Sequence, residues 1–186
     1  HCPPELRARL EAVLDSGVAA HNIILGGDSA GGALAFNLLS RLCADAGPLP
    51  RALFVFSPLT DFLHEGVSFR ENAAREAVLP AAQAGLMAEM YLAGANPSDP
   101  AVSPLRADYR GAPPVWITVG STEILRDDAR RMSTYLQDQN VNVTLVEEHD
   151  LPHVWPIFHN FLPEARTTLD ALTQWIKQVP STADES

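Results

Sequence analysis

Cysteine and basic residues are both scarce in this chain. Only two of its 186 residues are cysteines, Cys2 and Cys43. Their number and spacing form neither a zinc-ligand motif nor a disulfide framework, so no metal site is predicted. Acidic residues outnumber basic ones by 23 to 13, which gives a formal net charge of −10. Such a surface repels phosphate backbones and anionic lipids, so nucleic acid and anionic membranes are not expected partners.

Long hydrophobic runs are absent as well. No apolar run approaches the roughly 20 residues of a membrane-spanning helix, so no membrane span is predicted. The composition, 46% hydrophobic and 19% charged, is that of a globular protein with one substantial core. The first residue is His1 and no signal peptide is visible, so the N-terminus does not reveal the cellular location. The cytoplasm is the default expectation, and the sequence carries no signal for an oligomeric state.

Helical and strand patterns alternate along the chain. Apolar runs of strand length occupy residues 22–25, 52–56, 115–119 and 141–146. Helical spacing of apolar residues is found at 4–16, 33–43, 80–91, 129–136 and 163–178. This alternation predicts an α/β fold, a mostly parallel sheet with helices on both faces. Residues 61–110 lack a clear strand and are expected to form a cap-like insertion within a domain spanning 1–180, followed by a polar tail at 181–186.

One short segment carries the strongest chemical signal. Gly27-Asp28-Ser29-Ala30-Gly31 is a G-x-S-x-G sequence between a predicted strand and a predicted helix, the context of a nucleophile elbow. Such a turn strains the serine backbone, and glycine on both sides lets neighbouring chain pass close by. The pattern predicts that Ser29 presents its Oγ at a helix N-terminus, where amide N–H groups stabilise developing negative charge.

Two other interpretations of this motif exist. G-x-S-x-G also arises by chance in ordinary glycine-rich turns, and chymotrypsin-like proteases carry a similar Gly-Asp-Ser-Gly-Gly. In those proteases the serine comes last in chain order, whereas Ser29 lies near the start of this chain. The strand before the motif and the helix after it favour the nucleophile elbow.

A serine nucleophile needs a histidine that takes its proton and a carboxylate that orients the histidine. In a parallel sheet, reactive groups gather at the carboxyl ends of the strands. Because the base must reach the nucleophile, we expect a hydrogen bond between Ser29 Oγ and a histidine ring nitrogen. The candidates after the third and fourth predicted strands are Glu123, Asp127 and Asp128, then His149 and His153.

Four segments together resemble one known family. They are the nucleophile motif at 27–32, the Asp-Pro-Ala-Val-Ser-Pro-Leu segment at 99–105, Pro113-Pro114 before a strand that ends in Gly120-Ser121, and His153-Val154-Trp155. From about residue 3 to 178 the chain resembles the C-terminal part of the hormone-sensitive-lipase-like branch of the α/β hydrolases. The resemblance implies a partial α/β-hydrolase fold and a serine esterase that acts on small-molecule esters with short to medium acyl chains. It implies no cofactor and no metal.

Carried over residue by residue, the resemblance implies that Ser29 is the nucleophile, His153 the base and Glu123 the acid. The family's acid usually begins an Asp-Pro-Leu-like segment, and here Glu123-Ile124-Leu125 stands at that position. Glutamate can orient an imidazole as aspartate does, with one more methylene of reach. The chain order of serine, acid and histidine is that of α/β hydrolases.

Alternatives to two of these residues are kept. Asp127 is the second candidate acid, although acidic residues here could simply stabilise the first turn of a helix. His149 is the second candidate base because it is closer to the strand end. The other histidines are expected to be surface or packing residues: His21, His64 and His159.

The oxyanion of an acyl-transfer intermediate needs backbone donors. The resemblance implies that the N–H of Ala30 is one of them. The family's other donors come from a His-Gly-Gly-Gly-type loop upstream of the elbow, and no such sequence occurs within residues 1–186. We therefore expect the chain to be the C-terminal part of a longer protein or a truncated gene product. Two alternatives to an esterase are an inactive fragment and a non-catalytic ligand receptor on the same fold, a class that typically lacks the histidine.

Overall fold

The computed structural model describes residues 4–180, so Cys2 and the predicted tail at 181–186 lie outside the described residues. Four strands form one fully parallel sheet in the order β1-β2-β3-β4. Their bounds are Ile24–Asp28 (β1), Ala52–Phe56 (β2), Val115–Gly120 (β3) and Val143–Glu148 (β4). The predicted fold class, a parallel sheet with helices on both faces, is confirmed.

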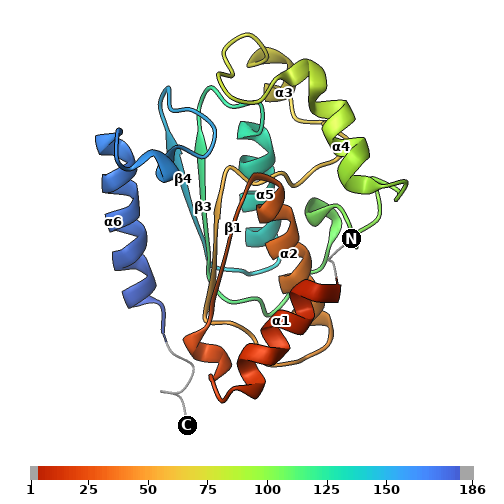
Figure 1. Cartoon of the computed structure of the whole chain (residues 1–186), viewed down its shortest axis with the longest axis vertical. Coiled ribbons are helices and arrows are strands. Elements are labelled where there is room, and N and C mark those ends of the chain that lie inside the picture. Colours follow the sequence, from red (N-terminus) through yellow and green to blue (C-terminus); the bar gives the residue numbers. More distant parts are fainter. Residues whose placement is uncertain (1–3, 181–186) are drawn as a thin grey trace.

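Two layers of helices enclose the sheet (Figure 1). Helices α2 and α5 cover one face and α6 covers the other, while α1 packs on the outside of α2. Because successive strands are added on the same side, right-handed crossovers place α2 and α5 on one face. The helices are α1 (Pro4–Asp15), α2 (Ser29–Ala44), α3 (Ser68–Glu71), α4 (Ala84–Leu92), α5 (Arg126–Asp138) and α6 (Pro163–Gln178).

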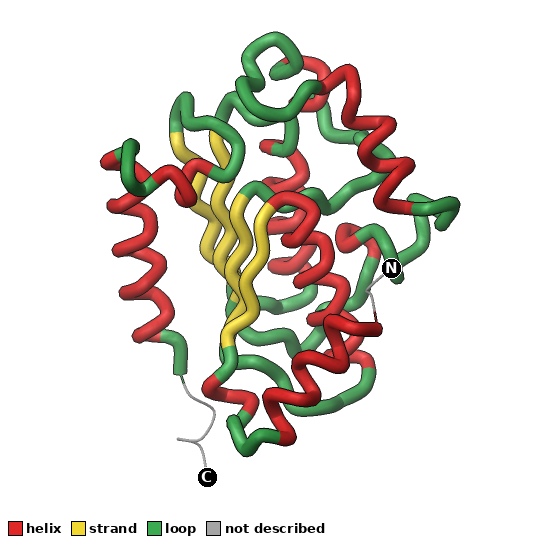
Figure 2. Tube along the Cα trace, in the orientation of Figure 1, coloured by secondary structure: helices red, strands yellow, loops and turns green. Residues whose placement is uncertain are grey.

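The strand residues alternate between two hydrophobic cores. Val55 and Ile117 point to the α2 and α5 side and are fully buried. Trp116 points to the other side, where its ring centroid lies 5.6 Å from that of Trp175 on α6. Helices on both faces explain why these central strands are apolar without interruption. The arrangement is clearest in the tube of Figure 2, where the strands run side by side between the helical layers.

The start of β1 differs from the expectation of a strand at 22–25. A 3-10 turn occupies Ala20–Asn22, and the strand begins at Ile24 and continues through the glycines to Asp28. These glycines pair in register with β2, Gly26 opposite Phe54. A Cβ at Gly26 would collide with the Phe54 ring. Gly26 therefore belongs to the strand because it makes room for the Phe54 side chain of β2.

Residues 61–110 contain helices and turns but no strand. No sequence pattern predicts α3, because a helix of four residues is too short to show a period. α4 begins at Ala84, later than the expected start at residue 80, because Ala81–Gln83 form a 3-10 turn. Within residues 4–180, none of the helices combines the length and the apolar character of a membrane span, and no three potential ligand side chains gather where they could hold a metal ion.

Candidate active site

Ser29 occupies the sharp turn between β1 and α2. It is the first residue of α2 and has a φ of 50°, in the left-handed region that non-glycine residues rarely adopt. This strain costs on the order of 1–3 kcal/mol and is typical of functional sites. Ala30 follows as the second residue of the helix, where a backbone N–H has no acceptor within the helix. The turn therefore presents a hydroxyl next to helix N-terminal donors.

The glycines around the turn have unequal roles. Gly27 is required, because a Cβ there would collide with the carbonyl oxygen of Gly31. The expectation that both flanking positions need glycine is wrong for Gly31, where a Cβ would meet only Asp28 Oδ1 at 3.9 Å, an ordinary contact. The second tight position is Gly32, whose Cβ would lie 2.8 Å from Pro58 Cβ. Close packing of α2 against the segment after β2 explains this difference.

Glu123 is 1% exposed and lies in the loop after β3. Its Oε1 accepts hydrogen bonds from Gly120 N–H at 2.5 Å and from Ser57 Oγ at 2.8 Å. Its Oε2 lies 2.7 Å from His153 Nδ1. Burial raises the pKa of Glu123, and the bonds from His153, Gly120 and Ser57 act in the opposite direction. Because an ionised carboxylate only accepts, these contacts fix the Nδ1–H tautomer of His153.

His153 is 5% exposed in the loop after β4. Its Nε2 is buried and has no hydrogen-bond partner among residues 4–180. The expected bond between Ser29 Oγ and His153 is therefore not formed in this structure. Catalytic hydrogen bonds are often long or misaligned without substrate and tighten when it binds.

The segment at residues 57–59 connects Ser29 to the His153 loop. The pairing of Asp28 with Phe56 places Ser29 level with Ser57 at the carboxyl edge of the sheet. Leu59 N–H donates to Ser29 O at 3.1 Å, and Ser57 Oγ accepts from Val154 N–H at 3.0 Å. One three-residue segment thus bonds both to the elbow and to the residue after His153.

The alternative site residues are placed elsewhere. Asp127 accepts from Ser68 N–H at 2.8 Å and from Arg126 Nε at 3.0 Å. Burial alone would raise the pKa of Asp127, but these two partners bring it below its ordinary value. His149 is exposed, in contrast to His153. The structure brings Glu123 and His153 together and leaves the alternatives outside this pair.

The loop that carries Glu123 (residues 121–125, the acid loop) is held by a clamp of hydrogen bonds from Ser68 and Asn72 that was not predicted from the sequence. Asn72 Nδ2 donates to the carbonyl oxygens of Ser121 and Glu123, at 3.0 and 2.8 Å. Ser68 Oγ donates to Ile124 O at 2.7 Å. These bonds join the region of α3 to the loop that carries Glu123. They are made by polar side chains to backbone groups, and such contacts leave no periodic signal in a sequence.

The chain is similar in sequence to known hydrolases over most of its length. The sequence profile of the alpha/beta hydrolase fold family matches residues 6–157. The chain belongs to the α/β-hydrolase fold family. An acetyl-hydrolase of Streptomyces hygroscopicus is 39% identical over 171 residues, and an esterase of Acinetobacter venetianus is 34% identical over 168 residues. These alignments cover 91% and 89% of this chain, and 57% and 55% of the two relatives.

Solved structures refine this assignment. An esterase of the bacterial hormone-sensitive lipase family superposes with a TM-score of 0.89 at 37% identity, covering 93% of this chain and 59% of that one. This α/β hydrolase therefore lies in the hormone-sensitive-lipase-like branch, as the sequence motifs predicted. The chain spans about half the length of the relatives that it matches.

A small apolar cavity of about 100 Å³ opens beside Ser29. Ser29 and Ala30 form one side, and Ile124 and Leu125 from the acid loop contribute another. The remaining lining residues come from the 57–92 region: Leu59, His64, Phe69, Leu79, Ala84, Met87, Ala88 and Tyr91. The cavity therefore lies between the elbow, the loop that carries Glu123 and the 57–92 region.

His64 is a packing residue that also lines this cavity. It was expected at the surface or in packing, and its ring does stack on Phe69 with centroids 4.3 Å apart. Yet it also lines the cavity beside Ser29, with a φ of 53°. Burial lowers the pKa of the His64 imidazole and so favours the neutral ring. The nearby carboxylate of Asp61 acts in the opposite direction but is the smaller effect. Its position in an irregular loop hides it from pattern analysis.

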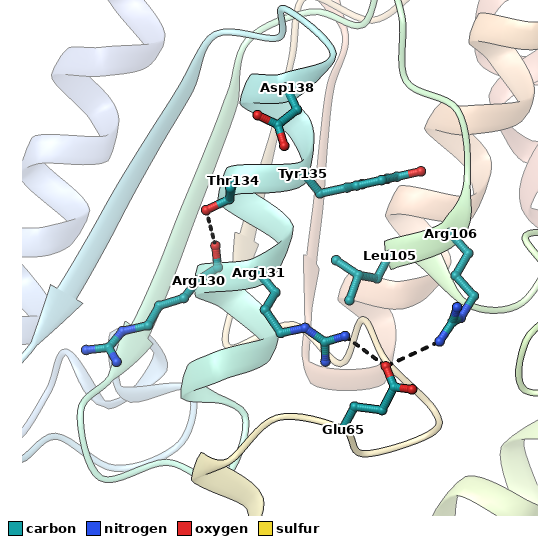
Figure 3. A pocket seen from close by; sticks show the side chains of 8 residues that line it. All are labelled: Glu65, Leu105, Arg106, Arg130, Arg131, Thr134, Tyr135 and Asp138. Atoms are coloured by element: carbon teal, nitrogen blue, oxygen red, sulfur yellow. Dashed lines mark hydrogen bonds and ion pairs between the residues drawn. The ribbon is translucent and has the colours of Figure 1, made fainter.

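A larger cavity of about 470 Å³ lies along α5, away from Ser29 (Figure 3). Arg106 and Arg131 both reach Glu65 there, at 3.4 and 3.0 Å. Arg130 is paired with Glu147 through two bonds of 2.7 Å. Because carboxylates already neutralise these guanidinium groups, the cavity is not a strong anion site despite its three arginines.

Proposed function

We propose that this chain carries the catalytic residues of a serine carboxylic ester hydrolase, with Ser29 as nucleophile, His153 as base and Glu123 as acid. The observation that carries the proposal is the buried Glu123–His153 pair at the same sheet edge as a strained serine. The Nδ1 side of the imidazole is bonded to the acid, so Nε2 is the nitrogen available for proton transfer. Relatives named esterase and acetyl-hydrolase support the same reaction.

The proposed reaction follows from these positions. Ser29 Oγ attacks the acyl carbonyl while its proton passes to His153 Nε2, and Glu123 stabilises the resulting imidazolium. The N–H of Ala30 donates to the developing oxyanion. His153 then gives the proton to the oxygen of the leaving alcohol. In the second half of the reaction His153 takes a proton from water, whose oxygen attacks the acyl carbon, and returns that proton to Ser29 Oγ as the acyl–serine bond breaks. All of the protons are carried by side chains of this chain.

The cavity beside Ser29 supports a short acyl chain as the substrate group. Its volume of about 100 Å³ is smaller than the roughly 150 Å³ that holds a benzene molecule in a protein interior. An acetyl group fits such a space, and an acyl chain longer than a few carbons requires displacement of the lining side chains. We further propose that residues 61–110, which supply much of this lining, act as a cap-like region of a hydrolase domain covering residues 1–180.

A serine-directed fluorophosphonate tests the proposed function. We expect the reagent to modify Ser29, and Ser29→Ala to lose both the label and hydrolysis of p-nitrophenyl acetate. The exposed turn residue Ser98 provides the matched control, since Ser98→Ala should label like the wild type. Labelling that persists in Ser29→Ala would overturn the proposal. Ester binding without any acylation of Ser29 would instead indicate a receptor or an inactive chain.

A further inference from the structure

Ser57 lies at the end of β2, outside the three residues of the proposed triad. It is fully buried, and its φ of 48° is in the left-handed region. Its N–H donates to Thr118 O at 2.7 Å, which continues the sheet ladder by one residue. A polar side chain held in a strained, buried position calls for a physical reason.

The hydroxyl of Ser57 joins the acid to the base loop. Val154 N–H can only donate, so at 3.0 Å Ser57 Oγ is its acceptor. The single proton of the hydroxyl is then directed to Glu123 Oε1, at 2.8 Å. Val154 itself has a φ of 57°, so two strained residues are linked by this bond. The hydroxyl therefore contacts the carboxylate and also the backbone one residue beyond His153.

The two oxygens of Glu123 have separate partners. Ser57 and Gly120 both donate to Oε1, which leaves Oε2 for His153 Nδ1. With two donors on one oxygen, the carboxylate plane is fixed against rotation about its terminal bond. Donation to the carboxylate also favours its ionised form, against the effect of burial.

We propose that Ser57 is a positioning residue for the esterase reaction, holding Glu123 and the His153 loop in register. This inference rests on the proposed function for its kinetic consequence. Ser57 acts through Glu123 and Val154 and does not contact the reacting atoms. Without its hydroxyl, Oε1 keeps one donor and the buried Val154 N–H loses its acceptor, so the imidazole is less firmly oriented.

Two substitutions separate the hydroxyl from the backbone strain. Ser57→Ala removes the hydroxyl and keeps the strained φ, whereas Ser57→Gly removes the hydroxyl and tolerates that φ. In both variants we expect kcat for p-nitrophenyl acetate to fall about 10- to 100-fold, the range for one hydrogen bond to a charged group. KM should change less than about threefold, because the cavity is untouched. Ser103→Ala is the control, since the hydroxyl of this fully buried serine donates to Thr60 O at 3.3 Å and, among the described residues, forms no hydrogen bond with Glu123 or the His153 loop.

A proton NMR measurement gives a readout independent of turnover. The His153 Nδ1 proton should resonate far downfield in the wild type, disappear in Glu123→Gln, and shift or broaden in both Ser57 variants but not in Ser103→Ala. If Ser29→Ala leaves hydrolysis unchanged, the proposed function fails while this resonance still tests Ser57. Ser57 variants that match Ser103→Ala in kcat and in this resonance would overturn the inference. If Ser57→Ala does not fold, Ser57→Gly supplies both measurements.

Discussion

The polar side of Ser29, which carries Glu123 and His153, and the cavity side, which carries the apolar lining residues, differ in how they are built. Glu123 and His153 are at most 5% exposed and bonded to each other, and Gly120 N–H and Ser57 Oγ also donate to Glu123. Across the cavity, α4 carries apolar side chains into solvent, with Met90 75% exposed. α4 is held chiefly by packing, including the stacked rings of Phe62 and Tyr91 with centroids 4.7 Å apart.

This difference separates two tasks within one site. Hydrogen bonds are directional, so the polar side fixes the angle of the imidazole. Apolar packing has no such direction, so the cavity side sets a volume and tolerates exchange of side chains of similar size. We therefore expect substitutions on the polar side to change kcat and substitutions on α4 to change the choice of substrate.

The largest expected effect is on the polar side. Glu123→Gln should lower kcat by about 10³- to 10⁴-fold, because the neutral amide no longer stabilises the imidazolium and disturbs the tautomer. Asp127→Asn, in the first turn of α5, should change kcat by less than about fivefold, since Asp127 is engaged by Ser68 and Arg126. Steady-state kinetics on p-nitrophenyl acetate would decide. The reverse pattern would make Asp127 the acid and contradict the proposed triad.

A second effect concerns stability on the same side. Asp128 lies fully buried in the first turn of α5 and accepts from the N–H groups of Thr60 and Asp61, at 2.8 and 2.9 Å. Burial raises its pKa from 3.8 to about 7, helped by the nearby Asp61 and opposed by these bonds. The folded state thus binds the proton more tightly than the unfolded state. The stabilisation is present at acidic pH and is lost as the pH rises through about 7.

Urea unfolding at several pH values tests whether the free energy of unfolding falls as the pH rises. Asp128→Asn keeps an acceptor for both N–H groups but cannot ionise. Relative to this variant, the wild type should lose up to about 4 kcal/mol of its free energy of unfolding between pH 4 and pH 8. Parallel pH profiles for the two proteins would show that Asp128 is ionised throughout and that its hydrogen bonds outweigh burial.

A smaller effect is expected on the cavity side. Met87 lines the cavity and is 49% exposed, so Met87→Ala should enlarge the space without unfolding the protein. The ratio of kcat/KM for p-nitrophenyl hexanoate to that for the acetate should rise about tenfold, the effect of added room for a methylene group or two. Leu86→Ala is the matched control, because Leu86 precedes Met87 on α4, is 61% exposed and lies outside the cavity lining. Equal ratios in both variants would place the acyl group elsewhere.

The polar side and the cavity side also differ in how much of them can be predicted from the sequence. The strands around Val55 and Ile117 were predictable because burial on both faces demands continuous apolar runs. Glu123 and His153 were candidates because strand ends gather reactive groups, and their hydrogen bond was found only in the structure. The role proposed for Ser57 could not be predicted from the sequence, because a single serine before a proline forms no distinctive pattern.

The clamp and the cavity escaped prediction for a related reason. Asn72 donates hydrogen bonds to two backbone carbonyls of the loop that carries Glu123, 49 and 51 residues further along the chain. His64 reaches the cavity through an irregular loop. Contacts of this kind depend on how loops fold over the sheet edge, and neither periodicity nor composition encodes that path. Local patterns therefore predict the helices, the strands and the candidate site residues. The hydrogen bonds between the loops are seen only in the structure.

The smallest effect tests the strain at the nucleophile itself. Ser29→Ala and Ser29→Gly both remove the hydroxyl, but only glycine adopts the φ of 50° without penalty. Ser29→Gly should therefore be more stable than Ser29→Ala by about 1 kcal/mol in urea unfolding. Ser40, inside α2, supplies the control with the opposite sign, since glycine in a helix interior is less stable than alanine by about 0.5–1 kcal/mol. If the glycine variant is the less stable one at both positions, the elbow is unstrained, and the reactivity of Ser29 must then come from its neighbours alone.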